Sequence, residues 1–179
     1  MATCGASPLG ARRCASRRRR PNPRRSCCTC AQAVVCSGEF YAATQSAESG
    51  VLLLDVTTAP PRVLRRFDVA AALGEVPGPS VAFASEDLLL GTTYGDLDTG
   101  SADQAFLIDA SSGQIRQLAQ ASSAFVYGDV RCCAESCALA DTDKNGLYFW
   151  TIVDDRVSAP SLVQIHGAAG LPPRYLGAF

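Results

Sequence analysis

The sequence contains a single histidine, His166, among its 179 residues. This histidine follows the last predicted strand, and no Gly-x-Ser-x-Gly elbow precedes it, so a hydrolase built on a Ser–His pair is not predicted. The chain also lacks the glycine-rich loops that bind phosphate groups between a strand and a helix. The sequence therefore predicts no catalytic residue.

Long apolar runs are absent as well. No stretch approaches the roughly 18 consecutive apolar residues of a transmembrane helix, so no transmembrane segment is predicted. No window repeats apolar residues at helical spacing over a helical length, which argues against a helical fold. Hydrophobic residues nevertheless make up 47% of the sequence, which is enough for one globular core.

Acidic residues are missing from the first part of the chain. Residues 1–38 hold eight arginines and no Asp or Glu, whereas all 17 acidic residues lie in 39–179. The first part has neither an apolar period nor an apolar stretch long enough for an intact signal peptide. We therefore expect a disordered Arg/Cys-rich segment over 1–38 and one folded domain over 39–179. A basic arm for nucleic acid is a less favoured reading of the arginines, and a mis-started or non-native N-terminus is another.

Short apolar segments separated by turn residues recur three times after residue 39. Asp55 and Asp109 occupy matching positions 54 residues apart, and Thr151 takes the next matching position after a further 42 residues. Four short strands per repeat at about this spacing are typical of β-propeller blades. The predicted strands are 40–44, 50–56 and 62–69 in the first copy, 80–84, 87–91, 105–109 and 114–118 in the second, and 124–127, 137–140, 146–151 and 161–165 in the third.

The second copy carries the most specific resemblance to a known family. Phe106-Leu-Ile-Asp109-Ala-Ser-Ser-Gly113-Gln-Ile resembles the core motif of YVTN, NHL and quinoprotein-like propeller blades. Val51-Leu-Leu-Leu-Asp55 is a degenerate copy without the glycine, and the third copy has Thr151 in place of the aspartate. The resemblance implies an all-β fold, a partial β-propeller of about three four-stranded antiparallel blades. It also implies a scaffold whose loops or channel bind a ligand.

Three blades would leave the end sheets of such a fold uncovered, because propellers usually have roughly four to eight blades. The bare face of the third copy would carry Leu147, Phe149 and Thr151, or Tyr148 and Trp150, depending on the strand register. We therefore expect either self-association or a missing remainder of the propeller.

Asp141-Thr-Asp143-Lys-Asn145-Gly146 matches the start of a calcium-binding loop, in which alternating side chains direct oxygens inward. Asp141, Asp143 and Asn145 are therefore candidate Ca²⁺ ligands. Asp96 and Asp98, with Asp103 beyond them, offer a weaker second set in the preceding copy. The later acidic ligands of the motif are missing, and Asn-Gly also favours a metal-free hairpin turn. The plain turn is the preferred alternative, and Ca²⁺ binding stays open.

Cys132, Cys133 and Cys137 bracket a predicted turn between two strands. We expect Cys133 and Cys137 to be cross-strand neighbours joined by a disulfide, which would indicate an oxidising compartment. A buried unpaired cysteine and a redox-catalytic pair are the alternatives.

The favoured function is a non-enzymatic binding or scaffold module that uses propeller loops to contact a protein or a glycan. The disulfide and the family resemblance point to export to the bacterial cell envelope. The alternative is a fragment of a propeller enzyme, either a quinoprotein oxidoreductase or a lactonase-like hydrolase. No cofactor other than Ca²⁺ is predicted.

Overall fold

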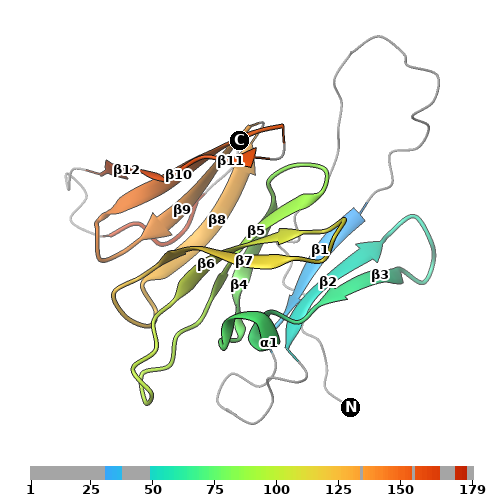
Figure 1. The fold of residues 1–179 in the computed structure, drawn as a ribbon, viewed down its shortest axis with the longest axis horizontal. Helices are drawn as coiled ribbons and strands as arrows, with labels where there is room; N and C mark the ends of the chain where they lie inside the picture. The colour runs from blue at the N-terminus through green and yellow to red at the C-terminus, as the bar shows by residue number, and fades with distance from the viewer. Residues whose placement is uncertain (1–30, 38–48, 134, 155, 166–171, 177–179) are drawn as a thin grey trace.

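A computed structural model of the chain describes residues 31–37, 49–133, 135–154, 156–165 and 172–176. These residues form three antiparallel sheets and one short helix (Figure 1). The prediction of an all-β chain with three small antiparallel sheets is therefore confirmed. None of the helical segments in the described part of the chain is long and apolar enough to cross a bilayer.

The first sheet consists of β1 (Ala31–Cys36), β2 (Gly50–Asp55) and β3 (Arg62–Phe67), hydrogen-bonded in that order. β1 lies inside the segment 1–38 for which disorder is predicted, so that prediction is wrong for Ala31–Cys36. Its six residues pair with the whole length of β2, from Ala31 opposite Asp55 to Cys36 opposite Gly50. A short apolar segment becomes a strand here because a neighbouring strand supplies its hydrogen bonds, which a periodicity argument does not detect. Residues 1–30 and the predicted strand 40–44 lie outside the described residues.

Helix α1 (Val69–Leu73) connects the first sheet to the second. The Asp68 carboxylate caps its first turn by accepting a hydrogen bond from the Ala71 N–H, and Gly74 ends it with a left-handed backbone at φ 80°. Both are standard helix-boundary chemistry. The helix falls in the connection that separates the first two predicted copies.

The second sheet is a four-stranded meander of β4 (Pro77–Phe83), β5 (Leu88–Thr93), β6 (Gln104–Asp109) and β7 (Ile115–Gln120). Every residue of β5 is buried. The sheet has a packed layer on each face, so its two central strands are apolar without alternation. Leu89, Phe106 and Ile108 face the first sheet, and Leu88, Leu90 and Leu107 face the third.

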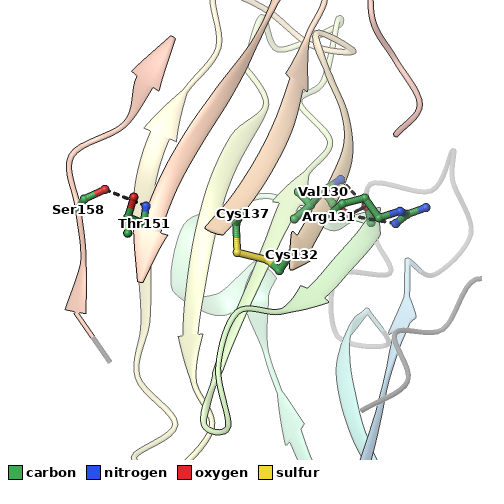
Figure 2. Close-up of a disulfide and its surroundings, with 7 residues drawn as sticks. Val130, Arg131, Cys132, Cys137, Thr151 and Ser158 are labelled. Atoms are coloured by element: carbon green, nitrogen blue, oxygen red, sulfur yellow. Dashed lines mark hydrogen bonds between the residues drawn. A yellow bond between two sulfur atoms is a disulfide. The ribbon is translucent and has the colours of Figure 1, made fainter. Parts of the chain in front are cut away.

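The third sheet contains β8 (Tyr127–Cys133), β9 (Ser136–Asp141) and β10 (Gly146–Val153). Two short strands, β11 (Arg156–Val157) and β12 (Ser161–Gln164), share the outer edge of β10. The Ser158 hydroxyl fixes the path between them by accepting a hydrogen bond from the Thr151 N–H at 3.0 Å (Figure 2). Tyr148, Trp150 and Ile152 face the second sheet. Of the two registers considered for β10, the structure therefore shows the one that leaves Leu147, Phe149 and Thr151 on the outer face.

A disulfide joins Cys132 on β8 to Cys137 on β9 (Figure 2). Cys133 is a free, exposed thiol. The predicted Cys133–Cys137 pairing is therefore wrong. The reason is the register of the hairpin: Cys132 lies directly opposite Cys137, with a Cα–Cα distance of 4.0 Å, and Cys133 lies opposite Ser136. Neighbouring residues in a strand point to opposite faces, so Cys133 cannot reach the same partner.

The first strands of the three sheets are neighbours. β4 contacts β1 on one side and β8 on the other. The contact with β8 includes a buried polar link, in which the Ser80 hydroxyl accepts a hydrogen bond from the Val130 N–H at 2.8 Å. The three sheets therefore form a row, with the second sheet between the other two (Figure 1).

Arg65 ties the outer part of the first sheet to the second. Its guanidinium donates to three carbonyls of the β6–β7 turn, those of Ala110 at 2.7 Å, Ser111 at 2.9 Å and Ser112 at 3.0 Å. The planar fork of arginine suits this arrangement because its N–H groups diverge in one plane. The same turn is held from inside by Asp109, which accepts hydrogen bonds from Ser111 and Ser112.

Candidate functional site

Three connections of the second and third sheets lie at one end of the molecule. They are the β5–β6 loop (94–103), the β7–β8 loop (121–126) and the β9–β10 turn (142–145), and together they are called the loop end below. Alternate connections of an antiparallel meander emerge on the same side, so β5, β7 and β9 all end here. Hydrogen bonds between the loops, described next, confirm that they are in contact.

Asp103 organises the loop end. Its side chain is fully buried, and Oδ1 accepts hydrogen bonds from the N–H groups of Gly95 at 2.7 Å and Phe125 at 3.0 Å. Oδ2 accepts a third from the Tyr127 N–H at 2.8 Å. A buried carboxylate with three such partners stabilises loop backbone that would otherwise bury unpaired N–H groups. One side chain of the second sheet thus fixes the chain where it enters the third.

An aromatic pair lies beside this carboxylate. The rings of Tyr94 and Phe125 are 5.7 Å apart between centroids, and Phe125 has a left-handed backbone at φ 59°. Burial raises the pKa of the Tyr94 hydroxyl, and the charge of Asp103 acts in the same direction. The unusual backbone of Phe125 persists because the Asp103 carboxylate accepts its N–H.

The β5–β6 loop holds its own shape through short-range contacts. Asp96 Oδ1 accepts a hydrogen bond from the Asp98 N–H at 2.8 Å, and the Asp96 N–H donates to the Ser101 hydroxyl at 2.8 Å. Gly95 allows the loop to close tightly, because a Cβ there would lie 2.3 Å from the Ser101 carbonyl oxygen. Asp96 and Asp98 are therefore part of a turn, and Leu97 at its tip is 71% exposed.

The three candidate Ca²⁺ ligands of the β9–β10 turn have three different partners. Asp141 Oδ1 accepts a hydrogen bond from the Lys144 N–H at 2.8 Å, and Asp143 accepts one from the Ser122 hydroxyl on the neighbouring loop. The Asn145 side-chain amide donates to the Ile165 carbonyl at 3.2 Å. Among the described residues, no three His, Cys, Asp or Glu side chains are grouped so that they could hold a metal ion.

The β9–β10 turn is not the two-residue Asn-Gly turn of the metal-free alternative. Asp141 pairs with Gly146, so the turn consists of the four residues 142–145, and Asn145, its last residue, has a left-handed backbone at φ 47°. Asn145 donates to Ile165 through its nitrogen, and Asp143 accepts from Ser122 at Oδ2, so these two hydrogen bonds do not use the Oδ1 atom of either side chain. Two carboxylates and one amide are fewer ligands than the roughly 6–8 oxygens that Ca²⁺ takes, and Ca²⁺ binding stays a prediction for titration.

A buried tyrosine lies directly behind the loop end. Tyr127 is opposite Asp141 in the sheet, and its hydroxyl is buried without a hydrogen-bond partner among the described residues. Its ring contacts that of Tyr148 edge to face, with centroids 6.4 Å apart. Burial raises the pKa of the Tyr127 hydroxyl, and burial also raises the pKa of the Asp141 carboxyl. The polar groups behind the loops are therefore held in their neutral forms more strongly than in water.

A hollow lies between β3, helix α1 and the β6–β7 turn. Its volume is about 370 Å³, and Arg65, Phe67, Asp68 and Gly113 contribute to its lining. The Arg65 guanidinium is committed to the turn carbonyls and also lies 5.6 Å from the centre of the Phe67 ring. The cation at this hollow therefore has a structural role, and the loop end is the stronger candidate for binding.

The sequence correctly predicts that the acidic loops are turns, but it does not predict that the Asp103 carboxylate holds their backbone. It treats Asp103 only as a distant addition to a calcium set, because its three backbone partners lie 8 to 24 residues away along the chain. No local pattern signals such contacts. The predicted lone histidine, His166, lies outside the described residues.

Comparison with known proteins gives no assignment for the chain. No protein-family model matches it, and no curated protein matches it significantly. Functional inference therefore depends on the geometry of the sheets and of the loop end.

Proposed function

We propose that this chain is a non-enzymatic binding or scaffold module of β-propeller type that contacts its protein or glycan ligand through the loop end. The main supporting observation is that the second and third sheets bring the three loops of the loop end together. One buried carboxylate, that of Asp103, fixes the backbone of these loops. Loops held by a rigid scaffold are favoured positions for binding surfaces.

The arrangement of strands supports the propeller part of the proposal. In a propeller each blade is a meander, and the first strands of successive blades line the central axis. Here β1, β4 and β8 begin the three sheets, and β4 contacts both of the others. The buried link between Ser80 and Val130 lies at one of these contacts.

The form of the loop end supports binding over catalysis. Its acidic side chains are used within the protein: Asp103 holds backbone N–H groups, Asp96 closes its own loop and Asp143 contacts Ser122. A general acid or base needs a group that is free to reach substrate. The exposed tip around Leu97 offers apolar contact area.

The disulfide supports export. Cys132 and Cys137 sit opposite each other in a hairpin, and such bonds persist in oxidising compartments such as the bacterial periplasm or cell surface. We accordingly propose the cell envelope as the location. Free Cys133 next to the bond gives a direct experimental check, because mass spectrometry of the exported protein can identify which cysteine is alkylated.

Array binding is the test of function. The labelled chain is applied to glycan and peptide arrays, alongside a variant with Leu97→Lys and Asp98→Lys at the loop tip and a control variant with Val63→Lys on β3. Binding that the loop-tip variant loses and the control retains is expected. Binding that all three proteins share would place the surface elsewhere. Hydrolysis of lactones, or reduction of an electron acceptor after loading with pyrroloquinoline quinone, would instead favour the alternative of a propeller enzyme.

A further inference from the structure

Residues 172–176, called the edge segment below, lie along the edge of β8 that β9 does not pair. The Asp129 N–H donates to the Arg174 carbonyl at 2.8 Å, and Arg131 Nε donates to the Leu176 carbonyl at 3.1 Å. The Leu176 N–H in turn reaches Asp129 Oδ2 at 3.4 Å. Arg174 is therefore beside Asp129 and Leu176 beside Arg131, so the edge segment runs in the same direction as β8.

An irregularity in β8 creates this docking edge. The register between β8 and β9 shifts between Tyr127 and Val130, which frees the Asp129 N–H from the ladder. A bulge of this kind redirects backbone groups away from the partner strand. Asp129 also pairs with Arg131 at 3.0 Å, so the two side chains that contact the edge segment hold each other in place.

Gly128 admits the edge segment at very close range. A Cβ at this position would lie 2.2 Å from the Arg174 carbonyl oxygen, which is backbone and cannot swing away as a side chain could. Glycine is used where another backbone approaches this closely. The edge of β8 is therefore shaped to take an extended chain.

The arginine of the edge segment reaches the loop end. Arg174 Nη2 donates to the Phe125 carbonyl at 2.7 Å, and its charge acts on Tyr94, the ring partner of Phe125. Tyr175, between the two anchored residues, is 81% exposed, and its hydroxyl has only a minor electrostatic effect on Tyr94. The surface therefore binds the arginine side chain and the backbone two residues beyond it, and leaves the side chain between them largely in solvent.

We propose that the bulged edge of β8 and the adjoining Phe125 carbonyl form a recognition site for an extended peptide with an Arg-x-x pattern, in which the third residue contributes only its backbone, and that residues 172–176 occupy this site within the chain. The proposal rests on the proposed binding function and names its ligand class, strand addition to an open edge. Because the edge segment is largely exposed and held by few contacts, it opens far more readily than the sheets. A second peptide of the same pattern can then take its place.

The first experiment tests the occupancy of the site in the full chain. Gly128→Ala should displace the edge segment, because the new methyl group collides with the Arg174 carbonyl. We expect trypsin to cleave after Arg174 at least tenfold faster in this variant, and the Leu176 amide to lose its protection from hydrogen exchange. Tyr175→Ala is the matched control and should change neither. Unchanged cleavage and exchange in a folded Gly128→Ala protein would overturn the proposal.

The second experiment tests binding in trans. A full-length variant with Arg174→Ala and Leu176→Pro lacks the guanidinium and one N–H of its own edge segment but keeps the site. We expect it to bind a fluorescent peptide of sequence Leu-Pro-Pro-Arg-Tyr-Leu-Gly-Ala-Phe, and to bind the arginine-to-alanine peptide at least tenfold more weakly. No binding of the parent peptide, or equal binding of both, contradicts the proposal.

A background control keeps the result interpretable if one variant misfolds. Adding Arg131→Gln to the Arg174→Ala and Leu176→Pro chain removes the Nε donor without placing any atom against the docked segment. We expect weaker peptide binding from this protein, and unchanged binding would contradict the assigned edge. Failure of peptide binding with intact loop-tip binding on the arrays would reject this site alone, whereas loss of both would reject the proposed function.

Discussion

The carboxylate of Asp103 accepts a hydrogen bond from the Tyr127 N–H at 2.8 Å, which joins the loop before β6 to the first residue of β8. Asp103 is fully buried, and Tyr127 is nearly so. The bond crosses from the second sheet to the third, and the other carboxylate oxygen holds two more N–H groups. The loop end is consequently a preformed surface, with a backbone fixed from beneath by one side chain.

Asp103→Asn should destabilise the protein markedly. An amide offers one acceptor oxygen in place of two, so at least one buried N–H loses its partner and faces an NH₂ group. Hydrogen bonds to buried charged groups are worth about 1.5–3 kcal/mol each, and we expect a loss of this size in urea unfolding. The control is Asp98→Asn on the exposed tip of the same loop, for which we expect a change within about 0.5 kcal/mol. Equal stability of the two variants would contradict the role given to Asp103.

Asp109 should contribute stability at neutral pH that is lost in acid. Hydrogen bonds from the Ser111 hydroxyl and from Ser112 hold the pKa of the Asp109 carboxyl well below its usual range. A lowered folded-state pKa stabilises the fold above the unfolded-state value of about 3.9 and ceases to do so as the pH falls through the folded-state pKa. The stability difference between the parent and Asp109→Asn should therefore be present at pH 7 and shrink below about pH 4.

Urea unfolding at a series of pH values measures this difference. Asp87→Asn is the control, since Asp87 is an exposed aspartate at the turn before β5. Because Asp109 is partly solvated, we expect its effect to stay below about 1 kcal/mol. A difference that grows as the pH is lowered would have the wrong sign for the account.

Calcium titration decides between the two alternatives for the β9–β10 turn. If Asp141, Asp143 and Asn145 bind the ion, calorimetry of the parent gives a heat signal that Asp143→Ala removes. Among the described residues no third acidic, histidine or cysteine side chain is grouped with Asp141 and Asp143, which favours a turn without metal. We therefore expect no heat at millimolar Ca²⁺, and no signal at the Asp96 and Asp98 set. A saturable signal lost in Asp143→Ala would show that the turn rearranges around the ion.

Self-association should occur through the outer faces of the end sheets. The outer face of the third sheet carries Leu147 and Phe149, together with Val153 and Val163, which are 53% and 51% exposed. Val163 lies opposite Leu147, so these side chains share one face. Apolar area of this kind marks an association site. Light scattering coupled to size exclusion should show dimers or larger assemblies of the parent.

The matched substitutions locate that interface. Val153→Lys with Val163→Lys should shift the population toward monomer, because charged side chains would be buried in the contact. Leu97→Lys also replaces an exposed apolar side chain with a charged one, but at the loop end, and it should leave the assembly unchanged. A parent protein that is monomeric at all concentrations would show that its sheet faces need no partner.

Most strands of the second sheet were predictable because alternation and turn residues are local signals. The strand predicted at 124–127 was misplaced, because β8 runs from Tyr127 to Cys133 and residues 124–126 belong to the loop before it. The run ending at Asp109 and the Ser-Ser-Gly turn after it predict β6, the turn and β7 at nearly their observed places. The cysteine pairing was not predictable, because a turn shorter by one residue moves Cys133 to the opposite face. Strand β1 and the docking of Arg174 on β8 were missed for another reason. Both depend on a surface supplied by residues distant along the chain.

The central claim is that β4 lies between β1 and β8, so that the second sheet packs between the first and the third. The most direct test is a nuclear Overhauser measurement on the assigned protein, between the Val130 amide proton and the Ser80 β-protons. Their heavy atoms are joined by a hydrogen bond of 2.8 Å, so the account predicts a strong cross-peak. Absence of that cross-peak, with the Val130 amide instead close to a strand other than β4 and β9, would contradict it.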